Sequence, residues 1–211
     1  MKTQVIFALL VASPSFSFGA SLILGISNLS PVAILVEPDG AAFLPNGTPL
    51  TVGTYSDFGA INPTNFAGAT NGFIPFATTT VDLAGSPGGF ISDNLVLDDS
   101  ITAIGDNIGA QLAVVVGDNT GWAVITNPTW IADGFAAPPI PSPTIGLLLG
   151  DPSNNFIAGN LVPDGFEFPT LGQFVDAIVL VPEPSSLGFL AMSLIFLRFR
   201  RRVDADGVND R

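Results

Sequence analysis

Histidine and cysteine are absent from this chain of 211 residues, and basic side chains are nearly absent. The basic residues lie only at the two ends of the chain: Lys2, Arg198, Arg200, Arg201, Arg202 and Arg211. Residues 3–197 therefore contain no Cys nucleophile, no Ser-His-Asp triad, no phosphate-binding lysine and no soft-metal ligand. These absences exclude most enzyme mechanisms, and we expect a protein that is not an enzyme.

Charge is scarce in this sequence and nearly all of one sign. Charged residues make up 11% of the chain, less than half of the roughly 25% that is usual in globular proteins. Of the 18 acidic residues, 14 lie between Glu37 and Asp176, where no basic residue balances them. Such a body repels nucleic acid and anionic lipid, so we expect no nucleic-acid partner. Hydrophobic residues make up 47%, which is too apolar for a disordered coil and sufficient for a packed core.

Residues 1–19 have the pattern of a secretory signal peptide. Lys2 supplies the positive charge, and residues 5–12 form a continuous apolar run that a proline follows. Cleavage between Gly19 and Ala20 suits the signal peptidase, which prefers small side chains before the cut. An uncleaved anchor or a buried strand is the alternative, but the run is short for a membrane span of about 20 residues.

Three elements follow one another near the C-terminus: a proline-flanked glutamate, an apolar run and an arginine cluster. The first is Pro182-Glu183-Pro184, which stays extended because proline fixes φ and restricts the residue before it. Residues 187–197 are apolar apart from one glycine and one serine, and these eleven residues are marginal for a span of about 20. An amphipathic or core helix is the alternative for this run. An arginine cluster follows, which we expect to stop translocation by the positive-inside rule. It consists of Arg198, Arg200, Arg201 and Arg202.

Behind a signal peptide and in this order, the three elements resemble the PEP-CTERM sorting domain of bacterial exosortase substrates, over about residues 181–202. The resemblance implies a precursor held in the inner membrane and cut near the Pro-Glu-Pro motif by an exosortase-type processing enzyme. It further implies delivery to the cell surface or extracellular matrix, in association with exopolysaccharide and biofilm material. The family usually ends at the arginine cluster, whereas this chain continues with a polar tail over residues 203–211.

Glycine and proline are so closely spaced in residues 20–180 that long helices do not fit. Only residues 90–104 form a stretch longer than nine residues without either, and an Asp-Asp-Ser turn signal lies inside it. Mean helices have about 11–12 residues, so we expect an all-β body, a single β-sandwich or jelly-roll-like domain. The signal peptide and a short C-terminal hydrophobic helix would flank this domain. The proline-rich stretch 136–143 is expected to cross over within it rather than to divide it.

Short apolar runs between turn residues indicate the expected strands. The clearest pair is a hairpin of residues 111–116 and 122–126, joined by a Gly-Asp-Asn-Thr-Gly turn. The unbroken hydrophobicity of residues 112–116 predicts a central strand covered on both faces, and Phe is expected to supply most of the core's aromatic volume. Segments 50–57 and 111–130 also resemble a recurring, uncharacterised body of some short proteins with this sorting tail. The other expected strands are residues 22–26, 32–36 and 178–181.

Carboxylates are the remaining side chains for catalysis, as in glycoside hydrolases. The candidates are Asp98, Asp99 and Asp118. Sugar sites usually also use arginine, which residues 20–180 lack, and adjacent aspartates before a serine are typical of a turn. A carboxylate-based glycoside hydrolase is therefore a distant alternative.

Calcium is the better ligand hypothesis, because it binds carboxylate and carbonyl oxygens. Five aspartates lie within 26 positions, in or near predicted turns: Asp93, Asp98, Asp99, Asp106 and Asp118. No loop has a known calcium-binding spacing, so we favour solvated carboxylates that keep an apolar body soluble. Calcium binding stays an alternative, and no other metal or cofactor is expected.

Two tryptophans, Trp122 and Trp130, are either core residues or platforms on which a sugar ring stacks. We favour the core, because hairpin and core aromatics are the commoner case. Two functional classes follow from the sequence. One is a structural or adhesive component of the extracellular matrix, and the other is a surface module that binds a carbohydrate or calcium.

Overall fold

The computed structural model describes residues 21–30, 32–83, 88–98, 106–132, 134, 142–168 and 173–183. These residues form an all-β body with very little helix, which confirms the prediction of an all-β class. The signal peptide, the 187–197 run, the arginine cluster and the polar tail lie outside the described residues. The strands are β1 (Ser21–Ser27), β2 (Ala33–Val36), β3 (Pro49–Tyr55), β4 (Phe73–Thr80), β5 (Ser92–Asp98), β6 (Gln111–Gly117), β7 (Gly121–Ile131), β8 (Thr144–Leu148), β9 (Asn155–Ala158), β10 (Asn160–Phe168), β11 (Gln173–Val179) and β12 (Val181–Pro182).

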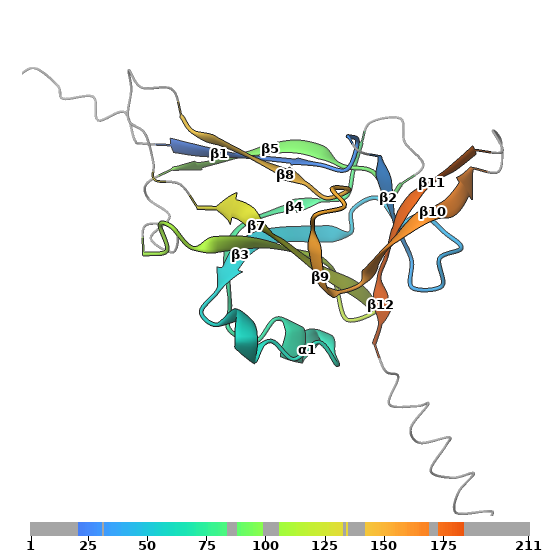
Figure 1. Cartoon of the computed structure of the whole chain (residues 1–211), viewed down its shortest axis with the longest axis horizontal. Coiled ribbons are helices and arrows are strands. Elements are labelled where there is room, and N and C mark those ends of the chain that lie inside the picture. The colour runs from blue at the N-terminus through green and yellow to red at the C-terminus, as the bar shows by residue number, and fades with distance from the viewer. Residues whose placement is uncertain are drawn as a thin grey trace, which may run out of the picture.

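The strands form three sheets (Figure 1). The largest has six strands in the order β12-β7-β6-β3-β4, with β9 also paired to β7, and all of its pairs are antiparallel. A three-stranded sheet, β5-β1-β8, lies over one face of it and includes the parallel pair β1–β8. The third sheet, β10-β11-β2, stands at one end of the body and includes the parallel pair β11–β2.

The main core lies between the three-stranded and six-stranded sheets. Strand β1 alternates strictly, so that Leu22, Leu24 and Ile26 are buried while the residues between them are half-buried. This alternation is expected of a strand with one face on a core. Opposite β1, the main core takes Val114 and Ile125 from β6 and β7.

Strand β6 is buried along both faces, as the sequence predicts for residues 112–116. Val114 and its neighbours two residues away point into the main core, whereas Ala113 and Val115 belong to a second cluster on the opposite face of the sheet. The predicted hairpin is also confirmed, because β6 and β7 pair with Val115 opposite Val124. Strand β7 continues to Ile131, beyond the predicted end, after a register shift.

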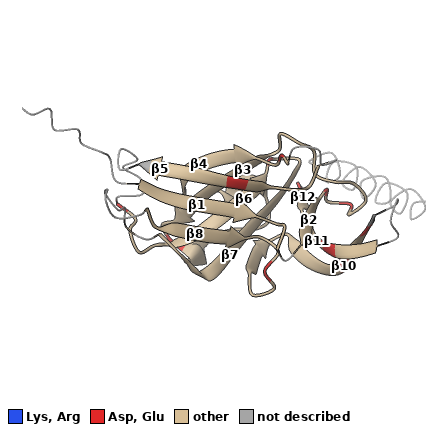
Figure 2. Ribbon diagram, turned by 90° about the horizontal axis from the view of Figure 1, so that it is seen from above, with Lys and Arg blue, Asp and Glu red and all other residues tan. Residues whose placement is uncertain are grey.

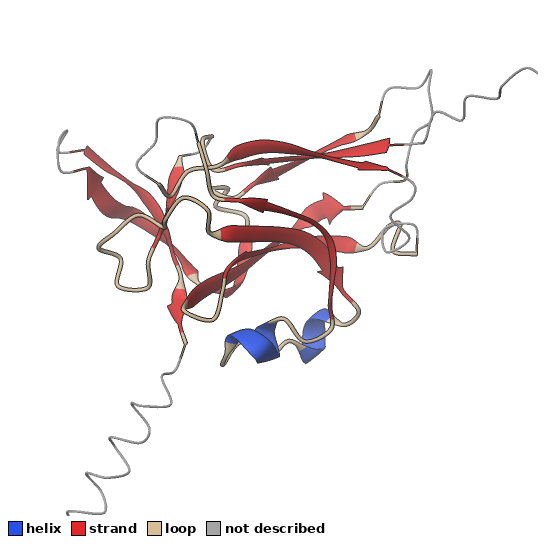
Figure 3. Ribbon diagram, turned by 180° about the vertical axis from the view of Figure 1, so that it is seen from behind, coloured by secondary structure: helices blue, strands red, loops and turns tan. Residues whose placement is uncertain are grey.

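A short helical segment covers the second face of the large sheet (Figure 3). It contains a 3-10 turn, Phe58–Ala60, and a four-residue helix, α1, Phe66–Ala69. The Tyr55 hydroxyl at the end of β3 donates to the Ala69 carbonyl over 2.7 Å, which ties the helix to the sheet. Nothing in the Gly- and Pro-rich sequence of this segment indicated that it would cover a hydrophobic cluster.

The remaining expected strands are present, with one correction. The expected strands 22–26 and 32–36 are confirmed as β1 and β2, which lie in different sheets. The expected strand 178–181 is split: β11 ends at Val179, buried Leu180 follows, and β12 joins the large sheet. Trp122 is the largest fully buried side chain among the described residues, and Phe76 and Phe166 are buried as well. Six further phenylalanines pack against the clusters while partly buried: Phe43, Phe58, Phe66, Phe73, Phe90 and Phe156.

Candidate functional site

The Pro-Glu-Pro motif begins inside the last strand of the folded body. In β12, Val181 lies opposite Trp122 and Pro182 lies opposite Gly121, in an antiparallel pair with β7. Pro182 has no backbone N–H to continue the ladder, so a strand that ends there is expected. The first residue of the Pro-Glu-Pro segment, Pro182, is therefore part of the sheet.

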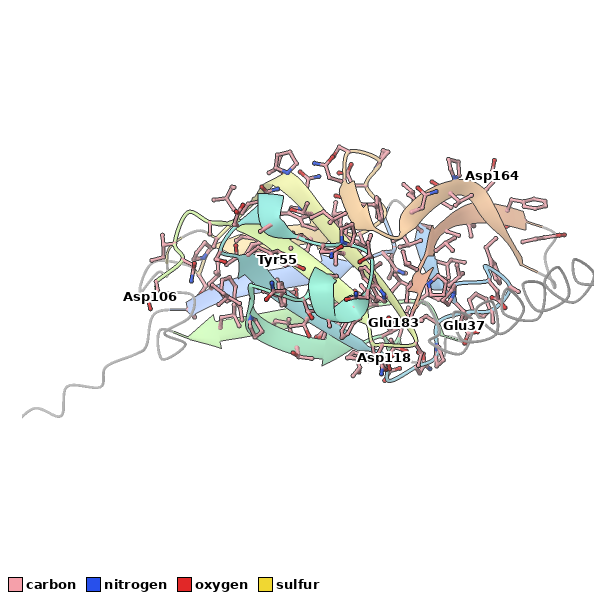
Figure 4. All side chains as sticks on the ribbon, turned by 90° about the horizontal axis from the view of Figure 1, so that it is seen from below. Glu37, Tyr55, Asp106, Asp118, Asp164 and Glu183 are labelled. Atoms are coloured by element: carbon pink, nitrogen blue, oxygen red, sulfur yellow. The ribbon has the colours of Figure 1, made fainter. Side chains whose placement is uncertain are left out.

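Glu183 follows β12 and contacts helix α1. The backbone N–H of Phe66, the first residue of the helix, donates to Glu183 Oε1 over 2.6 Å. The side chain of Asn65 caps the same helix by accepting from the Gly68 N–H over 2.6 Å. The first N–H groups of a helix have no partner within it, and here two residues 118 positions apart satisfy them. Figure 4 shows Glu183 beside the helix.

An apolar cluster lies beneath this contact. Trp122 is fully buried in it, and the Phe66 ring meets Trp122 edge-on with ring centroids 6.2 Å apart. Val181 packs against the same cluster. Trp122 Nε1 is the buried side-chain polar atom that has no hydrogen-bond partner within the described part of the chain. Because Trp122 and Trp130 are both buried, neither is available as a sugar-stacking platform.

A cavity of about 350 Å³ adjoins Gly121, the β7 residue that lies opposite Pro182. Hydrogen bonds from the Thr120 hydroxyl and the Thr120 N–H, both over 2.7 Å, lower the pKa of Asp118 at this cavity. Those bonds form the turn between β6 and β7, so they explain the position of the carboxylate without a ligand. The cavity is lined by Glu37, Pro38, Leu44, Pro45, Thr48, Asp118, Thr120 and Gly121.

The aspartates considered for calcium or catalysis do not form one site. Asp93 Oδ2 accepts from the Thr79 hydroxyl over 2.6 Å, and Asp98 pairs opposite Ser21 at the far end of β5. Figure 4 shows Asp106 at one end of the body and Asp118 far from it, beside Glu183, and Figure 2 shows the acidic residues spread over the ribbon. Within the described ranges, no three His, Cys, Asp or Glu side chains are placed to hold a metal ion. Asp99 lies outside those ranges.

The predicted sorting residues are described only in part. Pro182 and Glu183 lie at the junction of β12, β7 and α1. The other predicted processing and stop-transfer residues lie outside the described part of the chain: Gly19, Ala20, Pro184, Arg198, Arg200, Arg201 and Arg202. Sequence reasoning missed Phe66 as the partner of Glu183. The available signal was Asn65, a common helix-capping residue that directly precedes Phe66.

The chain matches no protein-family model, no curated protein and no solved structure. Among the residues that the structure describes, no helix is both long enough and apolar enough to span a membrane. The resemblance to the sorting domain thus rests on residues 181–202 of the sequence itself. The chemistry that can be assigned to the site is that of a docked, extended peptide segment.

Proposed function

We propose that this chain is an exported bacterial surface or extracellular-matrix protein, processed at the sorting signal over residues 181–202. A signal peptidase would cut between Gly19 and Ala20. The C-terminal signal would hold the precursor in the inner membrane until an exosortase-type enzyme cuts near the Pro-Glu-Pro motif. Neither processing step uses catalytic chemistry from this chain, which we propose is not an enzyme.

One observation carries this proposal: the last strand and the last side-chain contact that the structure describes lie at the motif. Strand β12 closes the large sheet at Pro182, and Glu183 makes the last described contact. Three residues, 184–186, then separate Glu183 from the apolar run. A cut near the motif would therefore release the body with both of its hydrophobic clusters, on the two faces of the large sheet, unbroken.

We propose that the released unit is a single β-sandwich with a structural or adhesive role beside exopolysaccharide. Its main core lies between two facing sheets, which supports a sandwich. The parallel pairs β1–β8 and β11–β2 favour a sandwich over a jelly roll, which is built from antiparallel strands. With 14 acidic residues and no basic side chain, the unit suits partners that are neutral, cationic or bridged by a divalent ion.

The binding-module alternative has less support. A carbohydrate would have to bind without stacking on Trp122 or Trp130, because both are buried. For calcium, the described aspartates are each engaged in local turns or strands and do not converge. The matrix-component proposal needs no such site.

Mass spectrometry of the protein released from the cell surface tests the processing route. We expect an N-terminus at Ala20 and a C-terminus near Pro182–Pro184, with or without an attached group. The membrane fraction is the matched control, where the precursor should still carry the arginine cluster. Surface protein that retains Arg200–Arg202 would contradict the proposal.

A further inference from the structure

We propose that the folded body holds the start of its own sorting motif, and that residues Val181–Glu183 must leave β7 and α1 before the chain is cut there. This inference rests on the proposed function, because it concerns the same processing step. It adds a regulatory contact: the docked segment is a latch, defined here as Val181–Glu183 with its partners in β7 and α1.

The first part of the latch is the strand pair. A protease binds its substrate as an extended chain, commonly by adding it as a strand to an edge in the cleft. Val181 and Pro182 already lie paired along Trp122 and Gly121 of β7. The backbone edge that faces β7 therefore cannot face a processing enzyme at the same time.

The second part of the latch is the motif's own carboxylate. Glu183 Oε1 accepts a hydrogen bond from the Phe66 N–H over 2.6 Å. Phe66 begins helix α1 and precedes Glu183 by 117 positions in the sequence. An enzyme that recognises the glutamate of the motif needs this carboxylate free. The contact also keeps Glu183 on the body, so that only residues 184–186 separate the body from the apolar run.

The latch is built to open without unfolding of the body. Within the described part of the latch, two residues pair with β7, and Pro182 contributes no N–H to the ladder. Segments held by few contacts open locally at a much smaller free-energy cost than global unfolding. Opening also frees three residues, which lengthen the extended tether by roughly 10 Å at about 3.3 Å per residue. Cleavage thus becomes possible once the tether has lengthened toward the membrane.

The position of Phe66 allows a test that leaves the motif untouched. Phe66→Pro removes both the ring and the N–H that Glu183 accepts, whereas Phe66→Ala removes only the ring. Proline is well tolerated at the first position of a helix, and Asn65 already has the extended backbone, φ −155° and ψ 162°, that a residue before proline prefers. The difference between the two variants therefore isolates the hydrogen bond to Glu183.

Two measurements are made on the full-length chain. Hydrogen exchange of purified precursor follows opening in the peptide that covers β11 and β12. Pulse-chase labelling in the native host follows conversion of precursor to surface protein. We expect both opening and conversion to be roughly tenfold faster in Phe66→Pro than in Phe66→Ala, the factor for one lost hydrogen bond to a carboxylate. Asn65→Ala, which weakens α1 through its cap, should change both rates in the same direction and replaces Phe66→Pro if that variant does not fold.

The outcomes separate the latch from the sorting route. If wild-type protein is cut near the motif but Phe66→Pro is converted no faster than Phe66→Ala, the latch is overturned and the proposed function stands. Equal exchange in the two variants also overturns the latch. If wild-type protein is never cut near the motif, the proposed function fails, and the latch has no role in processing.

Discussion

Tyr55 is the only tyrosine in the chain, and its environment predicts a loss of stability at alkaline pH. Its side chain is 5% exposed, and its hydroxyl donates to the Ala69 carbonyl over 2.7 Å. The rings of Phe58 and Phe73 lie 5.3 Å and 5.0 Å from it. Burial in this apolar setting raises the pKa of Tyr55 to about 12, because it disfavours the charged phenolate.

The direction and size of the effect follow from the two pKa values. In the unfolded chain the pKa is about 10, so the unfolded state releases its proton first as the pH rises. The contribution of neutral Tyr55 is fully present below pH 10 and is lost between pH 10 and about 12. At 1.36 kcal/mol per pKa unit, the free energy of unfolding should fall by about 3 kcal/mol. This is a large share of the roughly 5–15 kcal/mol that stabilises a typical domain.

Two optical signals make the measurement direct. The near-ultraviolet absorbance of tyrosinate reports Tyr55 alone, and the fluorescence of the two buried tryptophans follows unfolding by denaturant. Tyr55→Phe is the matched control, because it keeps the ring and removes the ionisable group. At neutral pH this variant should lose about 1 kcal/mol for the missing hydrogen bond. Between pH 10 and 12 its stability should change little.

Either of two results would refute this reasoning. One is titration of Tyr55 near pH 10 while the chain is still folded, which would mean that the hydroxyl is hydrated. The other is an equal alkaline loss of stability in wild-type and Tyr55→Phe protein. That result would assign the loss to other groups.

Two further predictions concern single residues. Gly53→Ala should cost about 2 kcal/mol or more by denaturant unfolding, because a Cβ there would lie 2.2 Å from the Ile74 carbonyl oxygen. Gly146→Ala, which meets nothing within 4 Å, is the control and should change stability by about 0.5 kcal/mol or less, so equal costs would contradict the argument. Asp118→Asn should lower the thermal midpoint at pH 7 more than at pH 3, since hydrogen bonds from Thr120 lower the pKa of Asp118. The ionised Asp118 stabilises the fold above about pH 4, and this contribution is lost as the pH falls through the lower pKa of the folded state. An equal shift of the midpoint at both pH values would show that these hydrogen bonds do not favour the charged form.

Local sequence patterns predicted the parts of the fold that depend on neighbouring residues. The spacing of glycine and proline excluded long helices, and the apolar runs on both sides of the Asp118 turn predicted the β6–β7 hairpin. The two-sided burial of β6 followed from its unbroken hydrophobic run. These inferences succeeded because backbone freedom, turn chemistry and side-chain alternation act within a few residues.

The same local patterns did not show where each aromatic side chain lies in the core. The chain has seventeen phenylalanines, and among the described residues the two tryptophans are the more deeply buried aromatic side chains. Several phenylalanines are only partly buried, because they lie in segments that cover the clusters from outside, such as Phe66 of α1. Composition shows how much aromatic volume the chain has, but packing decides where it goes.

The candidate site shows most clearly which features follow from the local sequence and which depend on the tertiary structure. The sequence by itself determined that an extended Pro182-Glu183 segment follows an acidic, all-β body, because proline restricts the backbone locally. Only the tertiary structure placed Glu183 on the Phe66 N–H, 117 positions away, and Pro182 beside Gly121 of β7. Backbone N–H and carbonyl groups are the same at every residue, so they carry no sequence signal for a distant partner. The packing of the whole sheet and of the helical segment beneath it decides which of them meet.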